Sequence, residues 1–316
     1  MEKDRFTSRI RLRHLHCFVA VAQEQNLGRA AARLMLSQPA ASKTLAELEE
    51  IAGTRLFERG RLGATLTEDG EAFLVHAVAV LDTLGAAGRA VSKHEAPSPT
   101  LLRVGALPTV AIDLLPLALG EFRAKRPHTS VQVQTAANAP LLASLKAGEY
   151  DLAIGRMADP EMMVGLSFEL LYVEPMIMVT RPGHPLLAND ALSLEAVLDY
   201  PLIVSPRGTI PRHNTESFLQ SRGLRLPESL VETLSVSLAR LMALRFDYVW
   251  FISAGAVRDD LERGLLARLP LATGGTEEPI GLLTRSEGRL STPAQELIAT
   301  IRDSAARQRA RLKSQA

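Results

Sequence analysis

The hydrophobic pattern of this chain changes at one short segment, residues 94–100, and that change restricts the possible folds more than any other feature. The segment contains two prolines and a serine, and no apolar side chain larger than alanine, which is typical of a linker. Before it, apolar residues recur at helical spacing. After it, short runs rich in β-branched residues alternate with amphipathic helical patterns. The chain is therefore expected to combine an all-α N-terminal part with an α/β part.

Composition places the chain among ordinary globular proteins, with 47% hydrophobic and 22% charged residues in 316. No run approaches the roughly 18 apolar residues that span a bilayer, and the charged start lacks the apolar core of a secretory signal. Cys17 is the only cysteine, so disulfides within the chain and cysteine-clustered metal sites are excluded. We expect a cytoplasmic protein with no membrane association, no metal and no cofactor.

The charge balance becomes informative only when it is divided along the chain. The net charge is +1, but residues 1–66 carry 11 Lys and Arg against 7 Asp and Glu. This modest local excess is what a phosphate-contacting domain would show. A solvated charged surface would explain the charge equally well, so the surrounding residues must decide.

Residues 12–52 are expected to form three helices. The third opens at Ser37, a plausible N-cap, with Pro39 in its first turn. The inward faces of the three helices follow the i, i+3, i+4 spacing of a buried stripe. They consist of Leu15, Phe18, Val19 and Ala22, then Ala30, Ala31 and Leu34, then Ala41, Leu45, Leu48 and Ala52. A different face of the third helix is small and polar with one cation, which suits close approach to a groove of DNA. It carries Gln38, Pro39, Ser42, Lys43 and Ala46.

Residues 56–67 are expected to form a short two-stranded wing. Gly60 and Gly63 permit the turn, and Arg59 and Arg61 could reach phosphates. Thr67 is then placed to cap a long helix, with acidic residues in its first turn.

That long helix carries an apolar seam at heptad spacing, formed by Phe73, Ala77, Val80, Leu84, Ala87 and Val91. Such a seam either pairs with a second copy of the chain or packs on the chain's own domain. Its position between the helical part and the linker favours a second copy.

Residues 13–70 resemble the N-terminal domain of LysR-type transcriptional regulators. The residues that carry the resemblance occur in order and at the family's spacing. They are Leu15, Phe18, Val21 and Ala22; Arg29, Ala30, Ala31 and Leu34; Ser37 to Ala40, Ser42 and Lys43; Leu48 and Glu49; Gly53 and Leu56 to Arg59; and Leu66, Thr67 and Gly70. The resemblance continues less sharply to about residue 305.

The resemblance implies that the third helix enters the major groove of double-stranded DNA. The positions that match the family's DNA contacts are Gln38, Pro39, Ser42 and Lys43, with Arg59, and Arg61 beside it, on the wing. Gln38 has both a donor and an acceptor for a base edge, and Lys43 suits a phosphate or guanine. Gly28 stands where the family often has Ser or Thr, so a helix cap or phosphate contact would be lost. Leu62 and Thr65 replace arginines that are common in the family's wing.

The second half contains the strand candidates 101–106, 130–135, 152–155, 175–180, 202–205, 248–253 and 280–284. In open α/β sheets, ligands bind at the carboxyl ends of the strands, where helix N-termini point their amides. The resemblance implies an effector-binding domain of two lobes, similar to periplasmic binding proteins, with an inducer held between them. We therefore expect a winged helix-turn-helix at residues 1–67 and a linker helix with hinge at residues 68–99. The effector domain would span residues 100–316, with lobe I at about 100–172 and 273–305 and lobe II at about 173–272.

The residues that match the family's inducer contacts are Thr109, Ser205 and Thr209, with Asn138 and Phe246 as weaker matches. Arg156 and Arg207 lie nearby, and a hydroxyl, a helix N-terminus and a guanidinium together suit a carboxylate. We expect a small organic anion as the effector. The alternative is that Thr109 and Thr209 are simply helix N-caps.

Residues 101–180 and 235–285 resemble most the regulators of protocatechuate breakdown, the pca operon subgroup, which respond to a dicarboxylic or tricarboxylic ring-cleavage intermediate. The resemblance also implies a homodimer or tetramer and contact with RNA polymerase.

Two other function classes remain as alternatives. An enzyme of the same α/β fold would need a phosphate loop, a nucleophile elbow or a zinc-binding histidine pair, and the sequence contains none. A plain solute-binding module would fit residues 101–305 but would leave the first 90 residues without a role.

Overall fold

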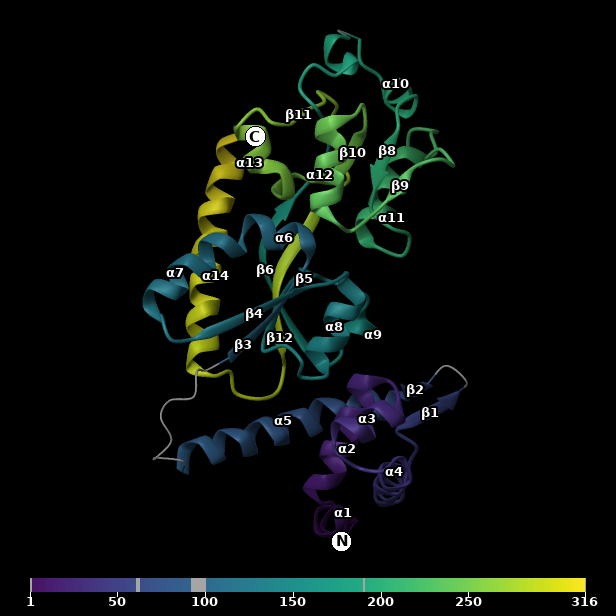
Figure 1. The fold of residues 1–316 in the computed structure, drawn as a ribbon, viewed down its shortest axis with the longest axis vertical. Helices are drawn as coiled ribbons and strands as arrows, with labels where there is room; N and C mark the ends of the chain where they lie inside the picture. Colours follow the sequence, from purple (N-terminus) through teal and green to yellow (C-terminus); the bar gives the residue numbers. More distant parts are fainter. Residues whose placement is uncertain (1, 61–62, 92–100, 190, 316) are drawn as a thin grey trace.

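A computed structural model describes residues 2–60, 63–91, 101–189 and 191–315, and it divides into a helical unit, a long helix and two stacked α/β lobes (Figure 1). The helical unit lies at the bottom of the view and the two lobes lie above it. None of its described helices is long and apolar enough to cross a membrane.

The N-terminal unit is built from four helices and a hairpin: α1 (Glu2–Arg9), α2 (Leu12–Glu24), α3 (Leu27–Arg33), α4 (Gln38–Ala52), β1 (Phe57–Gly60) and β2 (Gly63–Leu66). The predicted cap of α4 is confirmed, since Ser37 Oγ accepts a hydrogen bond from the amide of Ala40 at 3.3 Å. Gly53 ends the helix in the left-handed conformation, with φ of 74°. The core forms around Phe18, whose ring lies 5.2 Å from that of Phe57 and 5.0 Å from that of Phe73.

The predicted wing is confirmed as a hairpin in which Phe57 pairs with Leu66 and Gly60 with Gly63. Helix α3 keeps an N-cap despite Gly28, because the Asn26 side chain accepts from the amide of Arg29 at 3.0 Å. The expectation that this cap is lost is therefore wrong: the capping residue stands two positions earlier.

The predicted heptad seam runs along helix α5 (Glu68–Val91), and its two parts differ in what covers them. Its first part packs on the chain's own unit, since Ala77 is buried and Phe73 lies edge-on against Phe18. Val80 and Leu84, further along, are exposed, and the side chain of Val91 lies outside the described residues. Only the second part of the seam is therefore free to meet a second copy.

The lobes are two five-stranded sheets. The first sheet has the order β4-β3-β5-β12-β6, and the second has the order β11-β7-β10-β8-β9. The first lobe contains β3 (Leu101–Ala106), α6 (Pro108–Asp113), α7 (Leu115–Lys125), β4 (Ser130–Thr135), α8 (Asn138–Lys146), β5 (Leu152–Arg156), α9 (Pro160–Met163), β6 (Leu166–Glu174), β12 (Glu278–Arg285) and α14 (Thr292–Gln315). The second contains β7 (Met176–Thr180), η1 (Pro185–Ala188), α10 (Leu194–Leu198), β8 (Leu202–Val204), α11 (Ile210–Gln220), β9 (Val231–Glu232), α12 (Val236–Arg245), β10 (Val249–Ser253), η2 (Ala254–Val257), α13 (Arg258–Glu262) and β11 (Ala267–Arg268).

The chain passes between the lobes at the end of β6 and again before β12, and these strands pair antiparallel with Glu174 opposite Glu278. Strand β6 was not among the predicted strands. Its burial does not alternate regularly, and the β6–β12 ladder shifts register at Ile280 and Gly281. In its sequence, Leu166 to Leu170 alternate between apolar and polar residues, but Leu170 to Val173 form an unbroken apolar run, so the period of two does not extend through the strand.

Helix α5 and the N-terminal unit lie against the first lobe. The Gln23 side chain donates to the carbonyl of Ala147 at 2.6 Å, and Arg285 pairs with Asp82 at 2.7 Å. Gly148 adopts φ of 73°, and a Cβ there would lie 2.7 Å from Val78. A side chain at position 148 would therefore push the two parts away from each other.

Candidate functional site

A pocket of about 310 Å³ lies between the two lobes, at the carboxyl ends of their strands. The turns that follow β3, β4, β8 and β9 supply its walls, and the N-terminal ends of α6, α8, α11 and α12 face it. Most of its surface is apolar and comes from Leu107, Met162, Ile210, Val236, Trp250 and Ile252. The pocket is thus a mainly apolar cavity with helix amides at its margin, which suits a small molecule.

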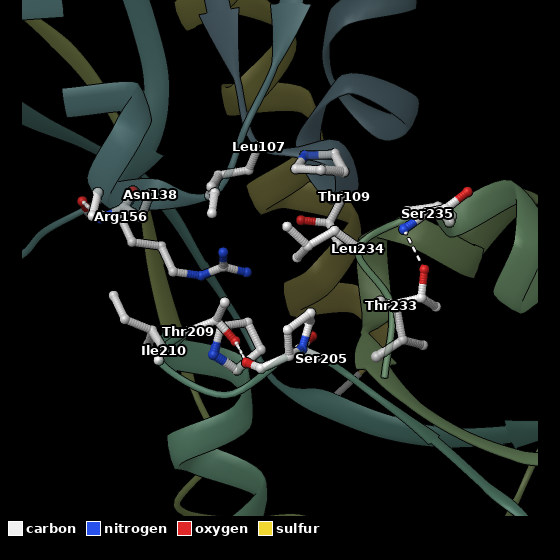
Figure 2. A pocket seen from close by; sticks show the side chains of 18 of the residues that line it. Leu107, Thr109, Asn138, Arg156, Ser205, Thr209, Ile210, Thr233, Leu234 and Ser235 are labelled. Atoms are coloured by element: carbon white, nitrogen blue, oxygen red, sulfur yellow. Dashed lines mark hydrogen bonds between the residues drawn. The ribbon is translucent and has the colours of Figure 1, made fainter. Parts of the chain in front are cut away.

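Two polar groups in this pocket have no hydrogen-bond partner among the described residues. These are the buried Oγ1 of Thr109 and the buried Nε of Arg156. Figure 2 shows both side chains pointing into the cavity from opposite walls. Because a buried donor without a partner is costly, this pair indicates a place for an acceptor supplied by a ligand or by water.

The guanidinium of Arg156 is held in place through one of its terminal nitrogens. Its Nη2 pairs with the Glu278 carboxylate and donates to Ser253 Oγ at 3.2 Å. Glu278 also accepts from Ser253 at 3.1 Å and from Asn214 at 3.1 Å. Both members of the Arg156–Glu278 pair are buried. The arginine therefore enters the pocket oriented, with much of its charge already compensated.

Asn138 and Thr209 line the pocket, but their polar groups already have partners. The Asn138 amide accepts from the backbone amide of Arg156 at 2.9 Å and donates to its carbonyl at 3.0 Å. Thr209 caps α11, accepting from the amide of Arg212 and donating to the carbonyl of Pro206 at 2.7 Å. The N-cap alternative thus describes Thr209, whereas the Thr109 hydroxyl has no such bond.

The remaining predicted effector residues lie in three different settings. Ser205 is buried at the pocket wall, and Arg207 lies at the rim with its side chain 83% exposed. Phe246 is not among the lining residues. It follows the last residue of α12, ten residues from the end that faces the pocket, which is about 15 Å along a helix. Its ring is mostly exposed.

Glu278 and Ser253 are functional candidates that sequence reasoning missed. Neither lies in a motif, and Glu278 is separated from Arg156 by the whole second lobe in sequence. The apolar wall formed by Trp250 and Ile252 could have been inferred, since alternate residues of the predicted strand at 248–253 face one side.

The predicted DNA-contacting residues of α4 lie together on one side of the helix. Gln38, Pro39 and Lys43 are exposed and Ser42 is half-buried, whereas Ala41, Leu45 and Leu48 point into the core. The backbone of Arg59 lies in β1, and its side chain is outside the described part. Arg61 lies outside the described residues altogether. The structure thus leaves a small polar helix face open to a partner.

Comparison with known proteins gives two family matches that together span most of the chain. Residues 12–71 match the model described as bacterial regulatory helix-turn-helix protein, lysR family, and residues 96–306 match the LysR substrate binding domain.

Two relatives are similar over almost their whole length. An uncharacterized HTH-type transcriptional regulator of Escherichia coli (strain K12), YdcI, is 52% identical over 96% of this chain and 99% of its own. The HTH-type transcriptional regulator PcaQ of Agrobacterium fabrum is 39% identical over 94% of this chain and 96% of its own.

A solved structure shares the fold. The full-length regulator LysG of Corynebacterium glutamicum, with its bound effector Arg, superimposes with a TM-score of 0.67. It covers 94% of this chain and 99% of its own, at 16% sequence identity.

Proposed function

This chain belongs to the LysR family of bacterial transcriptional regulators, and from that premise we propose that it controls a catabolic operon in response to a small organic anion. Its family membership, predicted from the motifs of residues 13–70, is confirmed. The chain is a DNA-binding regulator rather than an enzyme, as its relatives are.

In the proposed division of labour, residues 1–67 bind the operator, residues 68–99 join copies of the chain, and residues 100–316 bind the effector. The exposed Val80 and Leu84 of α5 support pairing with a second copy, because an apolar stripe at heptad spacing favours a helical partner. The assembled regulator would act in the cytoplasm, as a dimer or tetramer, and would meet RNA polymerase at the promoter.

For DNA recognition, we propose that Gln38, Pro39, Ser42 and Lys43 enter the major groove. Arg59 and Arg61 would contact phosphates of the neighbouring DNA backbone. The open face of α4 supports this assignment, since small residues let the helix backbone come close to the bases. Gln38 would pair with a base edge and Lys43 with a phosphate or guanine.

Replacing Gln38 by alanine should weaken binding to the operator by about 1–3 kcal/mol and relax the base preference at one position. The reason is the loss of a bidentate pair, while the exposed side chain contributes little to folding. Gel-shift titration at fixed salt measures the change. Gln220→Ala, at an exposed position on α11, is the matched control and should leave operator affinity unchanged. Equal affinities for wild type and Gln38→Ala would remove Gln38 from the interface.

For the effector, we propose a small carboxylate with an apolar body. The single observation that carries this is that Thr109, whose Oγ1 has no partner among the described residues, and the guanidinium of Arg156 point into the same mostly apolar pocket. The 39% identity to PcaQ supports an acid from aromatic catabolism. We assign Ser205, Thr209 and Asn138 to shaping the pocket, Arg207 to its rim, and no contact to Phe246.

A thermal-shift screen against aromatic-catabolism acids tests this proposal, because a ligand that binds only the folded state raises the melting temperature. Replacing Thr109 by alanine should keep DNA binding but weaken the ligand roughly 10- to 100-fold, since a hydrogen bond to a charged group contributes about 1.5–3 kcal/mol. Thr83→Ala on α5, outside the pocket, is the control. An unchanged response in Thr109→Ala would exclude the hydroxyl from the site.

A further inference from the structure

Two buried carboxylates face each other where the chain crosses between the lobes. Glu174 ends β6 and Glu278 begins β12, and they stand directly opposite in the antiparallel ladder. Both are at most 2% exposed. Like charges opposite one another on neighbouring strands are destabilising, and burial increases the cost. We call Glu174 and Glu278 the hinge pair.

The hinge pair lies in a compact set of charged and titratable groups drawn from every element around it. These groups are Arg156 of β5, Tyr172 of β6, Asp113 of α6 and Arg258 of α13. Arg258 contacts Asp113 through Nε and Nη2, each at 3.4 Å, and Gln308 of α14 donates to the same carboxylate. With all groups ionised, three carboxylates would face two guanidiniums. The set therefore carries one negative charge too many for a buried site.

Glu174 is the member of the set that best accepts a proton. Among the described residues its carboxylate accepts one hydrogen bond, from the backbone amide of Gly255 at 2.9 Å, whereas Glu278 accepts from Arg156, Ser253 and Asn214. A Cβ at Gly255 would lie 2.6 Å from oxygens of both Glu174 and Asp113, so these two carboxylates converge on the same glycine. Burial, opposed by Arg156, raises the pKa of Glu174 to about 7.

Arg156 connects this set to the pocket. Its Nη2 touches Glu278, and its guanidinium reaches into the pocket between the lobes (Figure 2). A ligand carboxylate beside this guanidinium would bring a further negative charge close to the hinge pair and would reduce the stabilisation that Arg156 gives to ionised Glu174.

We propose that ligand binding and protonation of the hinge pair are coupled, so that an anionic ligand engaging Arg156 causes the Glu174 carboxylate to take up one proton from solvent. The inference rests on the proposed function, namely that the pocket holds an organic anion. Its consequence is that ligand affinity falls as pH rises above neutrality, by at most about tenfold per pH unit. It also favours a monocarboxylate over the dicarboxylic and tricarboxylic intermediates that the subgroup resemblance implied, since the pocket compensates one added charge with one proton.

Isothermal titration calorimetry of the full chain tests the coupling, with benzoate as the probe. Titrations at one pH slightly above neutral, in buffers of different ionisation enthalpy, give the number of protons exchanged. We expect uptake of up to one proton for wild type and none for Glu174→Gln, which should still bind. Glu169→Gln is the matched control, because this exposed residue of the same strand pairs with Arg302 away from the pocket, and it should behave as wild type.

Two outcomes would overturn the coupling while leaving the proposed function intact: benzoate binding without proton uptake, or uptake that persists in Glu174→Gln. Failure of benzoate and of every acid in the thermal-shift panel to bind would instead overturn the proposed function, and the coupling with it. Infrared spectra of the unliganded protein add a readout that needs no ligand. A protonated-carboxyl band should titrate near neutral pH in wild type and be missing in Glu174→Gln.

Discussion

Replacing Arg156 by methionine is expected to lower the free energy of unfolding by about 3–5 kcal/mol, the usual cost of removing one partner from a buried ion pair. The change leaves the Glu278 carboxylate buried, with hydrogen bonds from Ser253 and Asn214 but without its cation. Methionine preserves most of the side-chain volume, so the loss reports the charge rather than a cavity. Ligand binding should be lost together with stability.

Chemical denaturation measures this loss of stability, and two further variants serve as controls. Arg302→Met removes an exposed pair with Glu169 and should cost less than about 1 kcal/mol. The double variant Arg156→Met with Glu278→Gln should recover part of the stability, since no charge is then left buried alone. It should not recover ligand binding. If Arg156→Met were as stable as Arg302→Met, the buried Arg156–Glu278 pair would contribute no more to stability than an exposed pair does.

Replacing Glu174 by glutamine is expected to change the free energy of unfolding little at low pH. Its main effect should be on how that free energy changes with pH. Burial raises the pKa of this carboxyl from 4.5 to about 7 in the folded chain. Between these two values the folded state holds a proton that the unfolded state has released, so wild-type stability falls as pH rises through this window and is level above it. Glutamine has no such proton and can still accept from Gly255.

The stability of wild type relative to Glu174→Gln should therefore fall by about 3 kcal/mol between pH 4.5 and about pH 7, at about 1.4 kcal/mol per pH unit. Denaturation curves of both proteins across this range check the slope. Glu169→Gln serves again as the control. Its pKa is lowered by the hydrogen bond from Arg302, so removing it should reduce stability above its pKa and not below it. Parallel curves for wild type and Glu174→Gln would show that the buried carboxyl does not titrate in this window.

The helix-turn-helix could be predicted because its signals are local. Ser37, Pro39 and the spacing of Leu45 and Leu48 fix a helix and its buried face without reference to distant residues. The heptad seam of α5 was harder, because periodicity shows that a face is apolar and not what covers it. Phe73 therefore turned out to pack on Phe18 of the same chain.

In the pocket, Thr109 and Arg156 could be predicted because both lie at the carboxyl ends of strands, where α/β ligand sites form: Arg156 ends β5, and Thr109 lies in the turn and helix that follow β3. The partners that orient Arg156 could not be predicted in this way. Glu278 and Ser253 reach it from strands β12 and β10, and the first lies beyond the whole second lobe in sequence. Phe246 was placed in the site by the family resemblance, but only the N-terminal end of α12 faces the pocket.

The proposed regulator couples the binding of an anion between its lobes to the binding of DNA by helix α4. Footprinting of the purified full chain on promoter fragments captured from its own genome, with and without a carboxylate that raises its melting temperature, tests this most directly. We predict discrete protected sites, their loss in Gln38→Ala, and a ligand-dependent change in footprint length that Thr109→Ala weakens. Uniform capture of all fragments, or a footprint that a bound ligand leaves unchanged, would contradict the account.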